Sequence, residues 1–115
     1  MKVIIAGGRY FDNYSLLVEK CDHYLKNQKD VEIVHGGAKG ADTLAGTYCL
    51  ARMLKVKVFH ADWKKHGNYA GPIRNKQMAD YADCLIAFWD GKSKGTKNMI
   101  TLAQVNGLKV RIVNY

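Results

Sequence analysis

The sequence predicts an α/β domain built on a parallel sheet, and three observations support this prediction. Five apolar or β-branched runs recur at intervals of about 25–30 residues. Segments with the apolar spacing of amphipathic helices lie between them. The runs are apolar or β-branched through most of their length, which is typical of strands covered on both faces. This order of elements predicts right-handed βαβ units.

The elements can be placed in chain order. The expected strands cover 2–7, 31–36, 56–61, 84–89 and 109–115. The expected helices cover 15–27, 41–54, 73–82 and 97–106. Asp12 or Asn13 is a suitable N-cap for the first helix, and Gly107 suits the position after the last one. The polar, aromatic and glycine-rich segment 62–73 fits neither pattern, so we expect a long functional loop there.

Length and composition indicate a single domain over residues 1–115. The chain is 48% apolar and 24% charged, as is usual for soluble globular proteins. No apolar run approaches the ~20 residues that span a bilayer, and the start resembles a strand rather than a signal peptide. We therefore expect a cytoplasmic protein without a membrane partner. The cysteines form no CxxC pair or zinc spacing and are expected to be reduced and in apolar positions: Cys21, Cys49 and Cys84.

The net charge of +8 favours an anionic partner such as a nucleotide, a phosphate or a nucleic acid. Solubility alone would also explain such a charge, so the positions of the basic residues decide more than their number. They recur at the predicted turns instead of forming one run: Arg9, Lys39, Lys64, Lys65, Arg74, Lys92, Lys94 and Lys97.

Four predicted strands end in turns rich in glycine, basic or aromatic residues. The carboxyl ends of parallel strands share one edge of the sheet, where ligands bind. In GGRYF, Gly8 permits close backbone approach and Arg9 offers a planar guanidinium to a phosphate. Tyr10 and Phe11 could stack on a base, or their rings could pack into the core.

The turn HGGAKGAD precedes a predicted helix. Its glycines leave backbone amides exposed beside the helix dipole, a combination that binds anions: Gly36, Gly37 and Gly40. Lys39 adds charge. The turn lacks the Gly-Lys-Ser/Thr of a P-loop and the spacing of GxGxxG. Asp42 either interacts with the helix dipole or accepts hydrogen bonds from ribose hydroxyls, and both readings remain open.

The segment GKSKGTKN also precedes a helix start. Gly95 exposes backbone amides, and Lys94 adds charge close to them. Thr96 either caps the helix or bonds a phosphate. A solvated basic loop is the alternative.

The segment AGPIRNKQM predicts a helix that begins near Pro72. Arg74 and Asn75 would lie in its first turn, where a cation opposes the dipole unless it serves a ligand or an acidic neighbour. Trp63 and Tyr69 are candidate platforms for stacking on bases, with core packing as the alternative for Trp63.

Signals for catalysis or metal binding are weak. No Ser/His/Asp order stands out, and the histidines at the predicted edge make no consistent ligand set, so we expect neither a metal nor a cofactor. Asp62 and Asp90 lie at strand ends and are candidate bases.

Four motifs in order resemble the YspA-like family of the SLOG superfamily of Rossmann-like proteins: GGRYFDN, VHGGAKGADTLA, FHADWKKHGNYAGPIRNKQM and FWDGKSKGT. The resemblance runs nearly end to end. It implies a Rossmann-like three-layer sandwich, with helices on both faces of a five-stranded parallel sheet in the order 3-2-1-4-5. It also implies a pocket for nucleotides or nucleotide-derived signals, and such proteins occur in bacterial conflict systems and in phages.

Two relatives within the superfamily imply other activities. The Lonely Guy phosphoribohydrolases carry PGGxGTxxE with a catalytic Glu. The matching segment GKSKGTKNM keeps Gly95-Thr96, but it lacks the two preceding glycines and has Met99 in place of the Glu. Hydrolysis by the same route is therefore not expected. The DNA-processing protein A fold binds single-stranded DNA.

The expected function is binding, without cleavage, of a cyclic nucleotide or an ADP-ribose-type signal. Such binding would suit a phage-encoded sponge for an immune signal, acting in the host cytoplasm as a homo-oligomer. Charge would be neutralised by Arg9, Lys39, Arg74 and Lys94. Tyr10 or Trp63 would stack on a base, and Asp42 would bind sugar hydroxyls. The alternatives are an N-glycosidase acting through Asp62 or Asp90 and a single-stranded nucleic-acid binder.

Overall fold

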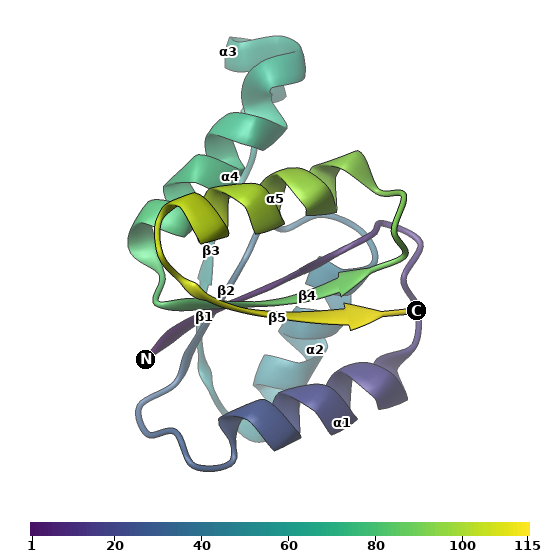
Figure 1. Ribbon diagram of the computed structural model, residues 1–115, viewed down its shortest axis with the longest axis vertical. Coiled ribbons are helices and arrows are strands. Elements are labelled where there is room, and N and C mark those ends of the chain that lie inside the picture. Colours follow the sequence, from purple (N-terminus) through teal and green to yellow (C-terminus); the bar gives the residue numbers. More distant parts are fainter.

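The computed structural model describes residues 1–115 and contains one five-stranded sheet (Figure 1). Its order is β3-β2-β1-β4-β5, and every neighbouring pair is parallel. This confirms the predicted class and strand order. The strands are β1 (Lys2–Gly7), β2 (Glu32–His35), β3 (Lys55–Val58), β4 (Cys84–Trp89) and β5 (Lys109–Asn114).

Helices cover both faces of the sheet. They are α1 (Tyr14–Leu25), α2 (Ala41–Arg52), α3 (Trp63–His66), α4 (Ala70–Tyr81) and α5 (Lys94–Val105), with a 3₁₀ turn η1 (Gly67–Tyr69) between α3 and α4. In Figure 1, α1 and α2 lie on one side of the sheet and α4 and α5 on the other. None of the helices combines the length and hydropathy that crossing a bilayer would require.

Two apolar cores explain why the strands are continuously apolar. Val3 and Ile5 of β1 pack with residues of α1 and α2, whereas Ile4 and Ala6 pack with residues of α4 and α5. Successive side chains of a strand point to opposite faces, so a strand covered on both sides needs apolar residues throughout. Cys21 lies in the first core, where burial raises the pKa of its thiol to about 12. All three cysteines are free.

The edge strand β3 is shorter than the predicted 56–61. It pairs only with β2, and the ladder between them ends at His35 and Val58. The Phe59 amide still donates to the His35 oxygen at 2.9 Å, and residues 60–61 then leave the sheet. The predictions for the helix ends are confirmed. Asn13 caps α1, since its Oδ1 accepts from the Leu16 amide at 3.0 Å, and Gly107 follows α5 with a φ of +75°.

The prediction of a loop over 62–73 was wrong, because most of this segment is helical. Asp62 caps α3 by accepting a hydrogen bond from the Lys65 amide at 3.1 Å. Gly67, with φ +55°, ends α3, and the 3₁₀ turn leads into α4. Because α4 begins at Ala70, Arg74 lies beyond its first turn rather than in it. Figure 1 shows α3 standing out from the body of the domain.

Candidate functional site

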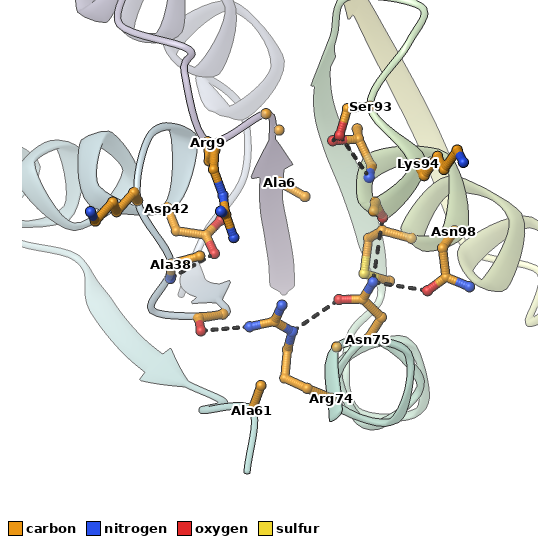
Figure 2. Close-up of a pocket in the computed structure, with 18 of the residues that line it drawn as sticks. Ala6, Arg9, Ala38, Asp42, Ala61, Arg74, Asn75, Ser93, Lys94 and Asn98 are labelled. Atoms are coloured by element: carbon orange, nitrogen blue, oxygen red, sulfur yellow. Dashed lines mark hydrogen bonds between the residues drawn. The ribbon is translucent and has the colours of Figure 1, made fainter. Parts of the chain in front are cut away.

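A cleft of about 1160 Å³ lies at the carboxyl edge of the sheet. It is bordered by the turns after β1, β2 and β4 and by the first halves of α2, α4 and α5 (Figure 2). The structure brings all the predicted site residues except Gly40 to its lining: Gly8, Arg9, Tyr10, Gly36, Gly37, Lys39, Asp42, Trp63, Arg74, Asn75, Lys94, Gly95 and Thr96.

Gly40 instead joins two turns behind the cleft. Its φ is +77°, and a Cβ there would lie 2.5 Å from the carbonyl carbon and oxygen of Arg9 and closer still to the Gly8 carbonyl oxygen. The same Gly8 oxygen accepts hydrogen bonds from the amides of Phe11 (3.1 Å) and Ala41 (3.3 Å). Gly40 therefore positions the turn after β1 against the start of α2.

The two aromatic residues of GGRYF have different environments. Phe11 is buried, with its ring centroid 4.9 Å from that of Phe88 and 4.7 Å from that of Tyr115. It cannot stack on a ligand, so that option was wrong for Phe11. Tyr10 is 90% exposed and lines the cleft.

The start of α5 offers two backbone amides to the cleft. Ser93 is the N-cap, and its Oγ accepts from the Thr96 amide at 3.3 Å. Thr96 is buried, with its hydroxyl 3.0 Å from that of Ser93, so the prediction of Thr96 as the cap was wrong. The amides of Lys94 and Gly95 have no acceptor in the structure. Uncapped amides at a helix start bind anions.

The two candidate bases have structural tasks. Asp90 Oδ1 accepts from the amides of Lys92 and Ser93, both at 2.8 Å, and these bonds hold the pKa of the carboxyl below its usual value. Asp90 thereby shapes the turn before α5. Asp62 caps α3 and lies outside the cleft lining.

A buried carboxylate and a guanidinium face each other across Gly36. Asp42 Oδ2 accepts from the Ala38 amide at 3.1 Å, and burial raises the pKa of Asp42 although the Ala38 amide and Arg74 act against this. Arg74 Nη1 donates to the Gly36 carbonyl oxygen at 2.7 Å. A Cβ on Gly36 would lie 2.7 Å from Arg74 Cζ and 3.0 Å from Asp42 Oδ2, so only glycine leaves room for both groups.

Asn75 connects this pair to the start of α5, as Figure 2 shows. Its Oδ1 accepts from Arg74 Nε at 3.0 Å. Its Nδ2 donates to Asn98 Oδ1 at 2.9 Å and to the Gly95 carbonyl oxygen at 3.4 Å. The side chain is buried and fully used, so Asn75 holds the two halves of the cleft together.

Sequence reasoning missed three polar side chains of the lining, those of Ser93, Asn98 and Tyr115. Ser93 stands three residues before Thr96, the spacing of an N-cap and its amide partner, and this signal was overlooked. Asn98 is one helical turn beyond Lys94, so helical periodicity would have placed it on the same face. Tyr115 follows β5 and therefore reaches the same edge of the sheet as the other turns.

His35 stabilises the turn after β2. It is buried, and its Nδ1 accepts from the Gly37 amide at 3.0 Å, which requires an unprotonated Nδ1. Burial, and to a lesser degree the charge of His60, lower its pKa below the usual 6.5. No group of three or more His, Cys, Asp or Glu side chains is placed to hold a metal ion.

Acidification is expected to destabilise the domain through His35. Because its pKa is lower in the folded state, the unfolded chain binds more protons below pH 6.5, and stability falls as the pH drops through that value. Between about pH 7.5 and about pH 5.5 the loss should be no more than about 1.4 kcal/mol, the limit for a histidine that stays unprotonated in the folded state. His35→Asn keeps an acceptor for the Gly37 amide and cannot titrate. Chemical denaturation at both pH values should give a smaller pH difference for this variant, and an equal difference would contradict the assignment.

Two solved structures share the fold of this chain. DNA processing protein A from Streptococcus pneumoniae matches with a TM-score of 0.79 and 21% identity, over 99% of this chain and 50% of that one. DNA processing protein A from Helicobacter pylori, described with a unique single-stranded DNA binding mode, matches with a TM-score of 0.77 and 20% identity, over 100% of this chain and 66% of that one. The chain thus spans about half the length of the S. pneumoniae protein and 66% of the length of the H. pylori protein.

Sequence comparisons identify the family. The Gene 61 protein of Mycobacterium phage D29 is 32% identical over 116 residues, which cover 95% of this chain and 93% of the phage protein. Residues 1–66, which include the turns after β1 and β2, match the model of the YspA, cpYpsA-related SLOG family. The chain belongs to the YspA, cpYpsA-related SLOG family.

Proposed function

We propose that the chain binds a nucleotide-derived small molecule in this cleft and holds it without cleaving it. The observation that supports this most is the pairing of two unlike sites across one cleft. Free amides and lysines lie at the start of α5, and a buried carboxylate, Asp42, lies at the start of α2. A nucleotide brings phosphates to the first and sugar hydroxyls to the second.

The phosphate end of the ligand would lie at α5. The first turn of this helix has no acidic residue, so its dipole is not offset. The side chains of Lys92 and Lys94 line the cleft beside the free amides. The start of α2 is a poorer anion site, because the Ala41 amide is already bonded to the Gly8 oxygen and Asp42 lies in the first turn.

The sugar would lie at Asp42. An ionised carboxylate accepts hydrogen bonds only, which suits a pair of ribose hydroxyls. Asp42 Oδ2 accepts from the Ala38 amide, and the carboxylate has further acceptor positions for sugar hydroxyls. Arg74 provides a nearby positive charge that favours the ionised form. Lys39 and Arg9 add positive charge to the lining.

The residues of the cleft favour binding over hydrolysis. Met99 is buried where the resembling hydrolases have a catalytic Glu. Asp62 and Asp90, the candidate bases of an N-glycosidase, are bonded to backbone amides. A protein that holds a cyclic nucleotide or an ADP-ribose-type signal without cleaving it would remove that signal from solution. One relative is a phage protein, and the proposal therefore extends to a phage-encoded sponge that would act against host defence in the host cytoplasm.

A ligand panel tests this proposal. The purified chain is mixed with mono-, di- and cyclic nucleotides and with ADP-ribose, and the melting temperature is measured. Bound material is then released by denaturation and weighed by mass spectrometry. A rise in melting temperature with release of the intact compound supports sequestration. Release of a free base would instead support the N-glycosidase, and no shift with any compound would contradict the proposal.

Lys94→Ala should weaken binding of the same nucleotides about tenfold, since a charge-assisted contact to phosphate contributes about 1.5–3 kcal/mol. Stability should change little, because Lys94 is exposed and makes no hydrogen bond through its side chain. Lys97→Ala is the matched control, as it removes the same charge from the same helix outside the cleft lining. Isothermal titration calorimetry gives both affinities. Equal losses would mean that only net charge matters and that no phosphate lies at α5.

Single-stranded nucleic acid is the second candidate ligand. The H. pylori neighbour is described as binding single-stranded DNA. The projecting segment of this chain also combines exposed aromatic and basic residues: Trp63, Lys64, Lys65 and Tyr69. Aromatic platforms with nearby cations are typical of such binding. Fluorescence anisotropy with labelled oligonucleotides at several salt concentrations would detect it, because affinity should fall steeply with salt.

A further inference from the structure

We infer that the ligand of this cleft carries two bases joined through phosphates, as in a dinucleotide. The inference rests on the proposed function and makes it more specific, because it sets the size of the ligand and the number of its rings. Three observations support it: the volume of the cleft, the positions of two exposed aromatic side chains, and the charge of its lining.

The cleft is large for a mononucleotide. Its volume of about 1160 Å³ exceeds the ~300–1000 Å³ of sites that enclose a drug-sized molecule. It also extends over several strand ends rather than one, from the turn after β1 to the segment after β3. A single nucleoside phosphate would leave much of this lining in contact with water.

Two of the three aromatic side chains in the lining follow different strands, and the third, Tyr115, packs its ring against Phe11. Tyr10 follows β1, and Trp63 starts α3 after β3. Strand β2 separates β1 from β3, so the two strands are roughly 10 Å apart. Figure 1 shows α3 projecting away from the connection that follows β1. Stacked rings approach to about 4.5–7 Å, so this spacing suits one base on each ring better than one base between them.

Neither ring belongs to one of the two apolar cores. Tyr10 is 90% exposed and Trp63 is 57% exposed, and neither packs against another aromatic ring. The second tryptophan, Trp89, differs, since its indole N–H donates to the Ser93 carbonyl oxygen at 3.1 Å. The indole N–H of Trp63 has no acceptor in the structure. The Trp63 ring lies beside Gly71 of α4, where a Cβ would be at an ordinary contact distance of 3.5 Å from Trp63 Cη2.

The lining of the cleft is positively charged. Five Lys and Arg side chains line the cleft against two carboxylates, Asp42 and Asp90: Arg9, Lys39, Arg74, Lys92 and Lys94. Phosphates that link two nucleosides would lie among these cations, while each base reaches outward to a ring. A ligand with one base and an uncharged remainder would leave part of this charge without a partner.

Calorimetry with three probes tests the number of bases. The probes are adenosine monophosphate, ADP-ribose and diadenosine pyrophosphate. ADP-ribose and diadenosine pyrophosphate both contain two phosphates and two riboses, and they differ in the second base. Stacking on aromatic side chains tolerates any base, so adenine serves as a general probe. Diadenosine pyrophosphate should bind at least about tenfold more tightly than ADP-ribose, because its second base adds one stacking contact.

Variants assign that difference to the two rings. Tyr10→Ala and Trp63→Ala should each weaken the two-base compound more than ADP-ribose, because a one-base ligand can use the remaining ring. Tyr69→Ala is the matched control, since Tyr69 is 75% exposed on the same projecting segment but lies outside the cleft lining. Its affinities should not change.

The outcomes separate the two claims. Equal affinity for ADP-ribose and the two-base compound, or variants that weaken both compounds equally, would overturn the two-base ligand and leave nucleotide binding intact. Weakening by Tyr69→Ala as large as by Trp63→Ala would also overturn it, because the ligand would then run along the projecting segment. No binding of any probe would overturn the proposed function as well.

Discussion

Gly40→Ala is expected to lower the free energy of unfolding by more than about 4 kcal/mol, or to prevent folding. One added carbon would lie 2.5 Å from the carbonyl carbon and oxygen of Arg9. These are backbone atoms of a turn whose Gly8 oxygen is already fixed by hydrogen bonds to the amides of Phe11 and Ala41. Neither side of the contact can move without breaking those bonds. The φ of +77° adds strain for any residue with a side chain.

Variants at two other glycines separate the cost of the close backbone contact at Gly40 from the cost of its positive φ. Gly67→Ala has a positive φ of +55° but open space around the added carbon, so it should cost only about 1–2 kcal/mol. Gly95→Ala has neither a positive φ nor a neighbour within 4 Å, and it should be neutral or slightly stabilising within α5. Urea denaturation measures all three. If Gly40→Ala cost no more than Gly67→Ala, the two turns would not be in close contact.

Gly40 also shows which features of the turn could be predicted from the sequence. Its pattern predicted a tight strand–turn–helix connection, and the structure has one. The sequence alone does not show which neighbouring group requires each glycine to lack a side chain. Gly36 leaves room for Arg74 and Asp42 in the cleft, whereas Gly40 leaves room for Arg9 behind it. That difference depends on two segments about thirty residues apart, and local patterns do not contain it.

The sheet was predictable because each strand carries its own signal. The central strands β1 and β4 are buried on both faces and appear as unbroken apolar runs, whereas the edge strands β3 and β5 alternate β-branched with basic residues. The segment after β3 was misread because its glycines and aromatic residues outweighed the caps. Asp62 and Pro72 are both helix-start residues, and the structure uses them in that way. Asn75 was placed in the cleft, but its task of joining Arg74 to α5 depends on tertiary contacts alone.

Arg74→Met is expected to lower the free energy of unfolding by about 2–3 kcal/mol and to abolish measurable nucleotide binding. The substitution keeps the aliphatic volume but removes the donors to the Gly36 oxygen and to Asn75 Oδ1. Those acceptors are partly or fully buried and would lose their partners. Asn75 would then be free to turn, which would loosen its bonds to Asn98 and Gly95 at the start of α5. Both ends of the cleft would be affected by one change.

Lys76→Met is the matched control on the same helix. Lys76 pairs with Asp80 on an exposed surface, and such pairs contribute at most about 1 kcal/mol. It lies outside the cleft lining, so nucleotide affinity should stay the same. Denaturation and calorimetry on the two variants give the comparison. If Lys76→Met destabilised the domain as much as Arg74→Met, the network around Arg74 would have no special importance.

The pH dependence of the destabilisation by Arg74→Met tests whether Arg74 stabilises the ionised form of Asp42. The pKa of Asp42 is raised above its usual 3.8 by burial, and the charge of Arg74 limits that rise. An acid with a raised folded pKa favours the protonated form in the folded state, so its burial costs more stability as the pH rises above 3.8. Without the charge of Arg74 the pKa of Asp42 rises further, so burying the ionised carboxylate costs more stability. The destabilisation should therefore be larger at about pH 7.5 than at about pH 5, and His35 cancels because both chains contain it. In an Asp42→Asn background the difference between the two pH values should disappear. If it persisted there, another carboxylate would be the partner of Arg74.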